Sequence, residues 1–193
     1  MLKLRALLLA TLCGAVAWVP QAATPQPAPP PALERDGQHD FDFEIGSWNI
    51  HLKKLMHPLS GAHDWVKFEG TSVTRKVWDG RSQLEEFETD SPTGHIEGLT
   101  LRLYNPATHE WSLYWANSKD GRMFPPQVGK FKNGMGEFYA MDTLNGRTIM
   151  VRFVWSKTDT ASPHFEQSFS DDGGKSWEVN WITDQTRSTP AAH

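Results

Sequence analysis

The chain has 193 residues, with 19 basic and 23 acidic side chains and a formal net charge of −4. This balance, with basic residues scattered beside acidic neighbours, argues against binding to the phosphate backbone of a nucleic acid. The single cysteine, Cys13, lies in an N-terminal apolar segment. We therefore expect no disulfide framework, iron–sulfur cluster or thiol catalysis in the rest of the chain.

The first residues have the organisation of a secretory signal peptide, predicted over residues 1–23. Lys3 and Arg5 precede an apolar run that ends at Val19, and small residues follow up to Ala23. The run is shorter than the roughly 20 residues that span a membrane, and no other stretch approaches that length. We expect no transmembrane segment, and export of the protein to the periplasm or the exterior.

A proline-rich stretch over residues 24–38 is predicted to form an extended tether. Residues 39–187 then form one domain of about 150 residues, which is an ordinary size for a single hydrophobic core. Residues 188–193 are predicted to be a disordered tail.

Almost every segment of the domain alternates apolar and polar residues with a period of two, which is typical of half-buried strands. The pairs Asn133-Gly134 and Asn145-Gly146 favour tight hairpins, so neighbouring strands are expected to be antiparallel. The strands are predicted over residues 47–55, 64–78, 82–90, 95–104, 110–117, 127–132, 135–143, 147–156, 164–171 and 176–184.

This pattern predicts an all-β fold, a single antiparallel meander of about ten strands closed into a lipocalin-like barrel. A flat meander would leave two long exposed edges, and closure removes them. A barrel of this size has room for a small ligand unless side chains fill it. The many tryptophans suit either outcome, because large aromatic side chains fill wide interiors and also line apolar sites.

Two arginines interrupt apolar strands at mid-length and are the first candidates for ligand contacts. An inward-pointing Arg102 or Arg152 can hold an anionic group, whereas an outward-pointing one is an ordinary surface residue. The sequence leaves the inward face of each strand open. Further polar candidates on similar strands are Tyr104, Tyr114, Glu166 and Asn180.

Residues 170–177 fit the pattern Ser-Xaa-Asp-Xaa-Gly-Xaa-Xaa-Trp, known as an Asp box. Asp172 can accept N–H groups of the turn, Gly174 can adopt a left-handed conformation, and Trp177 can cover the hairpin. The motif resembles a hairpin element of sialidases and related propellers that lies away from their chemistry. We interpret it as structural.

Acidic residues and histidines supply weaker signals. Residues 85–90 hold four carboxylates, but a glycosidase needs two that face each other across a cleft, and a local run is more typical of an edge strand. His39, His57 and His63 lie in expected loops without the spacing that places two imidazoles on one helix face. No metal site is predicted.

The opening Phe41-Asp42-Phe43 with Gly46-Ser47-Trp48, the segment from Leu101 to Trp111 and the hairpin up to Trp181 resemble an uncharacterised family of small exported bacterial proteins. The resemblance covers residues 39–187 and brings no established activity.

More distantly, the chain resembles lipocalin-like barrels, in which a Gly-Xaa-Trp on the first strand packs near an arginine from the end of the barrel. Gly46, Trp48 and Arg187 match those positions. The resemblance implies that the trio closes the barrel base and that the barrel holds a cavity for an apolar small molecule.

The opening is also similar to that of nitrobindin-type haem barrels, which ligate iron through a histidine late in the barrel. Here Asn49 and Ile50 follow the tryptophan instead of an early second glycine, and the last predicted strand has no histidine. His164 is the nearest match for a ligand, and we expect no cofactor.

These observations favour an exported barrel that binds a small apolar or amphipathic molecule. One alternative is a hydrolase acting on a glycan or an ester at the barrel mouth through Glu86, Glu88 or Glu166, which requires two converging carboxylates. Another is a solid barrel with an exposed aromatic patch that recruits a partner protein. An interior filled by tryptophan side chains would rule out the first.

Overall fold

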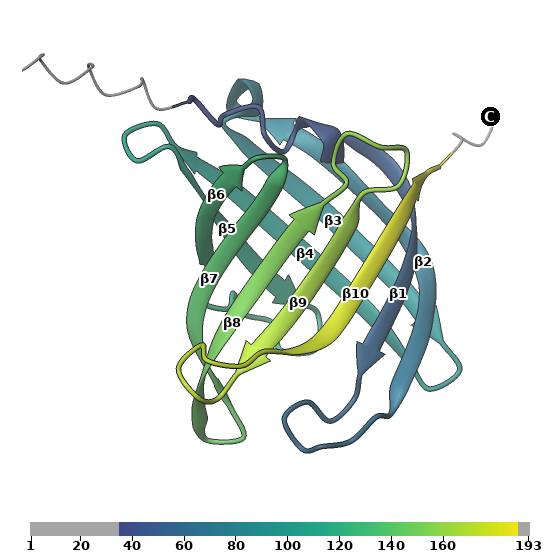
Figure 1. Cartoon of the computed structure of the whole chain (residues 1–193). Helices are drawn as coiled ribbons and strands as arrows, with labels where there is room; N and C mark the ends of the chain where they lie inside the picture. Colours follow the sequence, from purple (N-terminus) through teal and green to yellow (C-terminus); the bar gives the residue numbers. More distant parts are fainter. Residues whose placement is uncertain (1–34, 189–193) are drawn as a thin grey trace, which may run out of the picture. The chain divides into compact units, whose positions relative to one another are not determined.

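The computed structural model describes residues 35–188, in which ten antiparallel strands close into a barrel (Figure 1). This confirms the predicted all-β meander. The predicted signal peptide, most of the tether and residues 189–193 lie outside the described residues. No helix within the described part is long and apolar enough to cross a membrane.

The observed strands follow the alternation of apolar and polar residues closely. They are β1 (Gly46–Leu55), β2 (Trp65–Val77), β3 (Ser82–Ser91), β4 (Gly94–Asn105), β5 (Glu110–Asn117), β6 (Gln127–Lys132), β7 (Met135–Leu144), β8 (Arg147–Ser156), β9 (His164–Ser170) and β10 (Glu178–Arg187). Two short 3-10 turns are η1 (Asp42–Glu44) and η2 (Trp78–Gly80). The main difference from the prediction is β10, which continues to Arg187.

The barrel closes because β1 pairs with both its sequence neighbour β2 and the last strand β10. Trp48, for example, is opposite Ser72 on β2 and Arg187 on β10. Closure gives each strand two hydrogen-bonded neighbours and removes the sheet edges that would promote aggregation.

The segment before β1 packs into one end of the barrel, where η1 lies at the top of Figure 1. Phe41 is fully buried, with its ring centroid 5.3 Å from that of Trp111 and 5.5 Å from that of Phe138. The indole N–H of Trp111 donates to the carbonyl of Gly37 at 2.9 Å. Packing against the barrel therefore already includes Gly37, ahead of His39 where the domain was predicted to begin.

We call residues 35–45, the described segment before β1, the plug. Trp48 and Arg187 fix the plug to the barrel wall, in the arrangement implied by the lipocalin-like resemblance. The indole N–H of Trp48 donates to the carbonyl of Glu44 at 2.8 Å. Arg187 donates to the carbonyls of Ile45 at 2.6 Å and Phe43 at 2.8 Å, and its guanidinium lies 3.7 Å from the centroid of the Trp48 ring. Both ends of the barrel sequence thus close the same end of the lumen.

The hairpin between β9 and β10 is held by one carboxylate. Oδ1 of Asp172 accepts the backbone N–H groups of Lys175 and Ser176, each at 3.0 Å. Hydrogen bonds from Ser176 and Ser170 hold the pKa of the Asp172 carboxyl well below its usual range. Gly174 has a φ of +85°, a conformation that side chains other than glycine adopt at a cost.

Trp48→Ala should lower the free energy of unfolding by about 3–5 kcal/mol, because it empties a fully packed site beside the plug. Trp78→Ala is the matched control, since that side chain is 65% exposed, and should change stability by less than about 0.5 kcal/mol. Urea denaturation of both variants measures the difference. Equal stabilities would contradict the role given to Trp48.

Gly174→Val should lower the free energy of unfolding by about 1–3 kcal/mol, because a β-branched residue is forced into positive φ. Gly94→Val is its control: Gly94 has no positive φ, and a Cβ built there has no heavy atom within 4 Å. Thermal unfolding followed by circular dichroism compares the two. Equal melting temperatures of the two valine variants would show that the hairpin does not depend on the left-handed turn.

Candidate functional site

A cavity of about 380 Å³ occupies the part of the lumen that the plug does not fill. Seven of the ten strands contribute aliphatic or aromatic side chains to the wall, and ten of its 25 lining residues are polar or charged. The lining residues are Ile50, Lys54, Leu55, Met56, Pro58, Glu85, Phe87, Thr100, Arg102, Leu113, Trp115, Phe124, Gln127, Asp142, Leu144, Val151, Phe153, Trp155, Phe165, Gln167, Phe169, Asn180, Trp181, Thr183 and Gln185.

The mouth of the cavity lies at the end of the barrel opposite η1. Leu55 ends β1, and Met56 and Pro58 continue into the β1–β2 loop, which is at the bottom of Figure 1. The carboxylate of Glu178 on β10 accepts the N–H of Leu59, which ties this loop to the far side of the closing seam. Phe124, from the β5–β6 connection, completes the rim.

Aromatic side chains form most of the wall near the mouth. The ring centroids of Phe87, Trp115 and Trp181 lie 5.9–6.2 Å apart in edge-to-face and tilted contacts. Gly98 makes room for this group, because a Cβ added there would lie 1.9 Å from the Trp115 ring. A deeper group, Trp155 with Phe165, has a centroid separation of 4.9 Å.

A buried charge cluster lies at the junction of the cavity and the plug. Arg102 on β4 is 2% exposed and donates to Oε2 of Glu85 on β3 at 2.7 Å. Its Nη2 also lies 3.6 Å from Oε2 of Glu44 in the plug. Two carboxylates therefore face one guanidinium, whose cationic plane also lies 5.2 Å from the Phe41 ring centroid.

Glu44 is fully buried, and it links the plug to three strands. Burial, assisted by the like charge of Glu85, raises the pKa of Glu44 to about 7. The positive charge of Arg102 acts in the opposite direction. Its other oxygen, Oε1, accepts a hydrogen bond from the side chain of Gln185 on β10.

Amide side chains supply further polar contacts of the interior. Gln167 donates to Oδ1 of Asn180 at 2.7 Å, across β9 and β10. Gln127 donates to the carbonyl of Pro125 at 3.3 Å, and its Oε1 has no hydrogen-bond partner among the described residues. The inner wall thus combines apolar side chains with neutral hydrogen-bonding groups and the charge cluster around Arg102.

Within residues 35–188, Lys54 is the one basic residue that lines the cavity at its mouth. It lies on the inward face of β1, after Ile50 and Leu52, and its Nζ lies 5.3 Å above the ring centroid of Trp181. Burial lowers the pKa of Lys54, and the like charge of Lys119 lowers it further.

Of the six residues predicted for ligand contact, Arg102 and Asn180 line the cavity. Tyr104 also points inward, two residues beyond Arg102, but it lies under the plug. Its hydroxyl donates to Asp36 at 2.6 Å and accepts the N–H of Gly37 at 3.2 Å. It is part of the closed end rather than of the cavity wall.

The other three predicted residues lie on the opposite face of their strands, between residues that line the cavity. Tyr114 separates Leu113 from Trp115, so it points outward by the alternation of a strand. Arg152 points outward from β8 and stacks over Trp177 at 4.6 Å. Glu166 points outward from β9. These three do not join a cluster with Arg102 and Asn180.

His164, considered above as a haem ligand, lies outside the cavity wall as well. Its Nδ1 is 2.7 Å from Oδ1 of Asp184, and its Nε2 is 3.0 Å from Oε1 of Glu166. Burial lowers the pKa of His164, but these two carboxylates outweigh that effect and raise it. Both ring nitrogens are therefore engaged away from the lumen.

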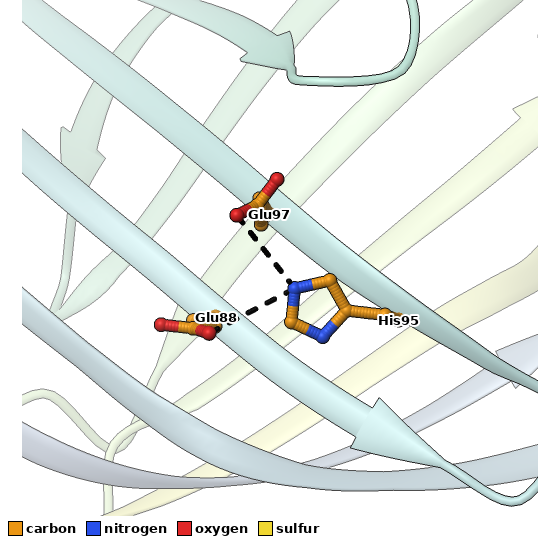
Figure 2. A group of neighbouring side chains, drawn as sticks. All are labelled: Glu88, His95 and Glu97. Carbon is orange, nitrogen blue, oxygen red and sulfur yellow. Dashed lines mark ion pairs between the residues drawn. The ribbon is translucent and has the colours of Figure 1, made fainter.

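One exposed group on β3 and β4 has the residue types of a metal site. Figure 2 shows His95 between Glu88 and Glu97, with its Nε2 3.8 Å from a carboxylate oxygen of each. One ligand atom from each residue lies within 4.8 Å of the others. Asp90 accepts from Nδ1 of His95 at 2.7 Å and raises its pKa. All three side chains are exposed, and ion pairing accounts for their positions.

The cavity wall also contains Lys54, Glu85 and Gln167, which are not among the predicted ligand contacts. Lys54 carried a usable signal, because it continues the inward series of Ile50 and Leu52 at a spacing of two. Glu85 belongs to the acidic run of residues 85–90, and the sequence gives no way to separate it from its outward-facing neighbours without the register of β3.

Replacing Glu44 by Gln should change how stability depends on pH. The folded state keeps a proton on Glu44 that the unfolded chain releases above pH 4.5, so its contribution to stability falls as the pH rises from 4.5 to about 7. Relative to Glu44→Gln, the unmodified protein should lose on the order of 1–3 kcal/mol over that range. Urea denaturation of both proteins across it measures the loss, and parallel curves would contradict it.

No protein-family model and no curated protein sequence matches this chain. Among solved structures, the S-type phycobiliprotein lyase CPES from Guillardia theta matches 81% of this chain and 95% of its own, with a TM-score of 0.56 and 12% sequence identity. At this identity the likeness shows a shared barrel fold. Membership of the family of small exported bacterial proteins stays a prediction.

Proposed function

We propose that this protein is an exported binding protein that holds one small, mainly apolar molecule in the lumen of its barrel. The observation that carries the proposal is the cavity of about 380 Å³, whose wall is mostly aliphatic and aromatic. Sites of this size and composition are typical of small-molecule binding. Arg102 and Asn180 remain as candidate polar contacts of the cavity wall.

Two features support a site that is formed before the ligand arrives. The plug is fixed by the hydrogen bonds of Arg187 to Ile45 and Phe43, and the wall is a closed sheet. A rigid wall lowers the ordering cost of binding, so apolar contact area converts more fully into affinity. The export part of the proposal rests on the sequence of residues 1–23.

The two alternatives find less support. The presence of a cavity is inconsistent with a solid barrel, although Trp48 and Trp111 do fill the closed end. The carboxylates suggested for a hydrolase, Glu86, Glu88 and Glu166, are absent from the cavity wall. The structural neighbour is named as a phycobiliprotein lyase, and at 12% identity its fold, rather than its activity, supports the proposal.

The test is binding of the neutral dye N-phenyl-1-naphthylamine, whose fluorescence rises in apolar surroundings. The unmodified protein should bind it at one site. Val151→Trp should weaken binding at least about tenfold, because Val151 is 3% exposed and faces the cavity, and the larger ring occupies the space of the ligand.

Val73→Trp is the matched control, because Val73 is 48% exposed on the outside of β2. It should leave dye affinity within about twofold. Near-ultraviolet circular dichroism checks that both variants keep their packing. Absence of dye binding by the unmodified protein, or equal loss in both variants, would overturn the proposal.

A further inference from the structure

We infer that the ligand carries one anionic head group, which rests at the mouth of the cavity beside Lys54 while the apolar body fills the lumen. This inference rests on the proposed function and names the class of molecule: an amphiphile with a head group such as a carboxylate.

The position of Lys54 is the first step. Its register partners are Trp181 on β10 and Val66 on β2, near the open ends of those strands. The side chain lines the cavity and lies over the Trp181 ring, so its ammonium group is held at the rim rather than free in solvent. Lys53, the preceding residue, is exposed on the outer face of the same strand.

The charge of Lys54 is uncompensated. None of the carboxylates within residues 35–188 forms an ion pair with it, and the like charge of Lys119 lowers its pKa further. A half-buried cation without an anionic partner raises the energy of the empty site. An anionic group placed there would offset both the burial and the repulsion from Lys119.

The other charged residues of the cavity wall are less favourable partners for an anionic head group. Arg102 is 2% exposed, and its charge is opposed by Glu85 and Glu44. Asp142 lines the cavity from β7, where its Oδ1 accepts the N–H of Thr143 at 2.7 Å. Its negative charge disfavours an anion on that side, so the favourable position for a head group is beside β1 and β10.

The experiment compares decanoate with decanol, which share a ten-carbon chain and differ in the head group. Each is titrated at pH 7.5 against the protein loaded with N-phenyl-1-naphthylamine, and displacement of the dye gives the affinity. The proteins are the unmodified chain, Lys54→Met, Lys54→Arg and Lys53→Met. Lys54→Met keeps the length of the side chain and removes the charge.

We expect Lys54→Met to weaken decanoate about three- to tenfold and to leave decanol within about twofold. Lys54→Arg should retain decanoate binding, and Lys53→Met should change neither affinity. Equal effects of Lys54→Met on both compounds, or no effect on decanoate, would overturn the inference.

The design separates this failure from failure of the proposed function. If the dye binds and Lys54→Met leaves decanoate affinity unchanged or weakens both compounds equally, the inference is wrong and the binding site stands. If the dye does not bind the unmodified protein, both the inference and the proposed function fail.

Discussion

The architecture depends on the compensation of Arg102, a full positive charge placed where solvent does not reach. An isolated guanidinium in such surroundings would cost several kcal/mol, so carboxylates have to meet it inside the barrel. Glu85 comes from the adjacent strand, whereas Glu44 comes from the segment before β1. The second of these contacts ties the position of the plug to the charge on the wall, and the bond from Gln185 extends the link to β10.

The charge cluster around Arg102 lies between two halves of the lumen, in which aromatic side chains have different roles. At the plugged end Phe41, Trp111 and Phe138 belong to one buried hydrophobic cluster. At the other end Trp115 and Trp181 stand around a cavity instead of filling it. The same residue type therefore supplies core stability at one end and an apolar wall at the other, with the charge cluster between them.

The sequence predicted the strands well, because period-two alternation and turn residues act locally. It could not tell which face is inside, since both faces of a strand can carry apolar residues. On β4, Leu101 and Leu103 are half-buried on the outside, whereas Arg102 points inward. On β8 the similar position Arg152 points outward. Only the register of the strands in the closed barrel determines that Arg102 points inward and Arg152 outward. Register depends on contacts between residues that are distant in sequence.

The distribution of charge along the lumen also suggests an orientation for a bound amphiphile. At the inner end Arg102 is already matched, so a charged head group there would lose its hydration without gaining an uncompensated partner. At the mouth the head group can keep part of its hydration while it meets Lys54. The lower-energy arrangement is therefore the apolar end toward the charge cluster and the head group toward solvent.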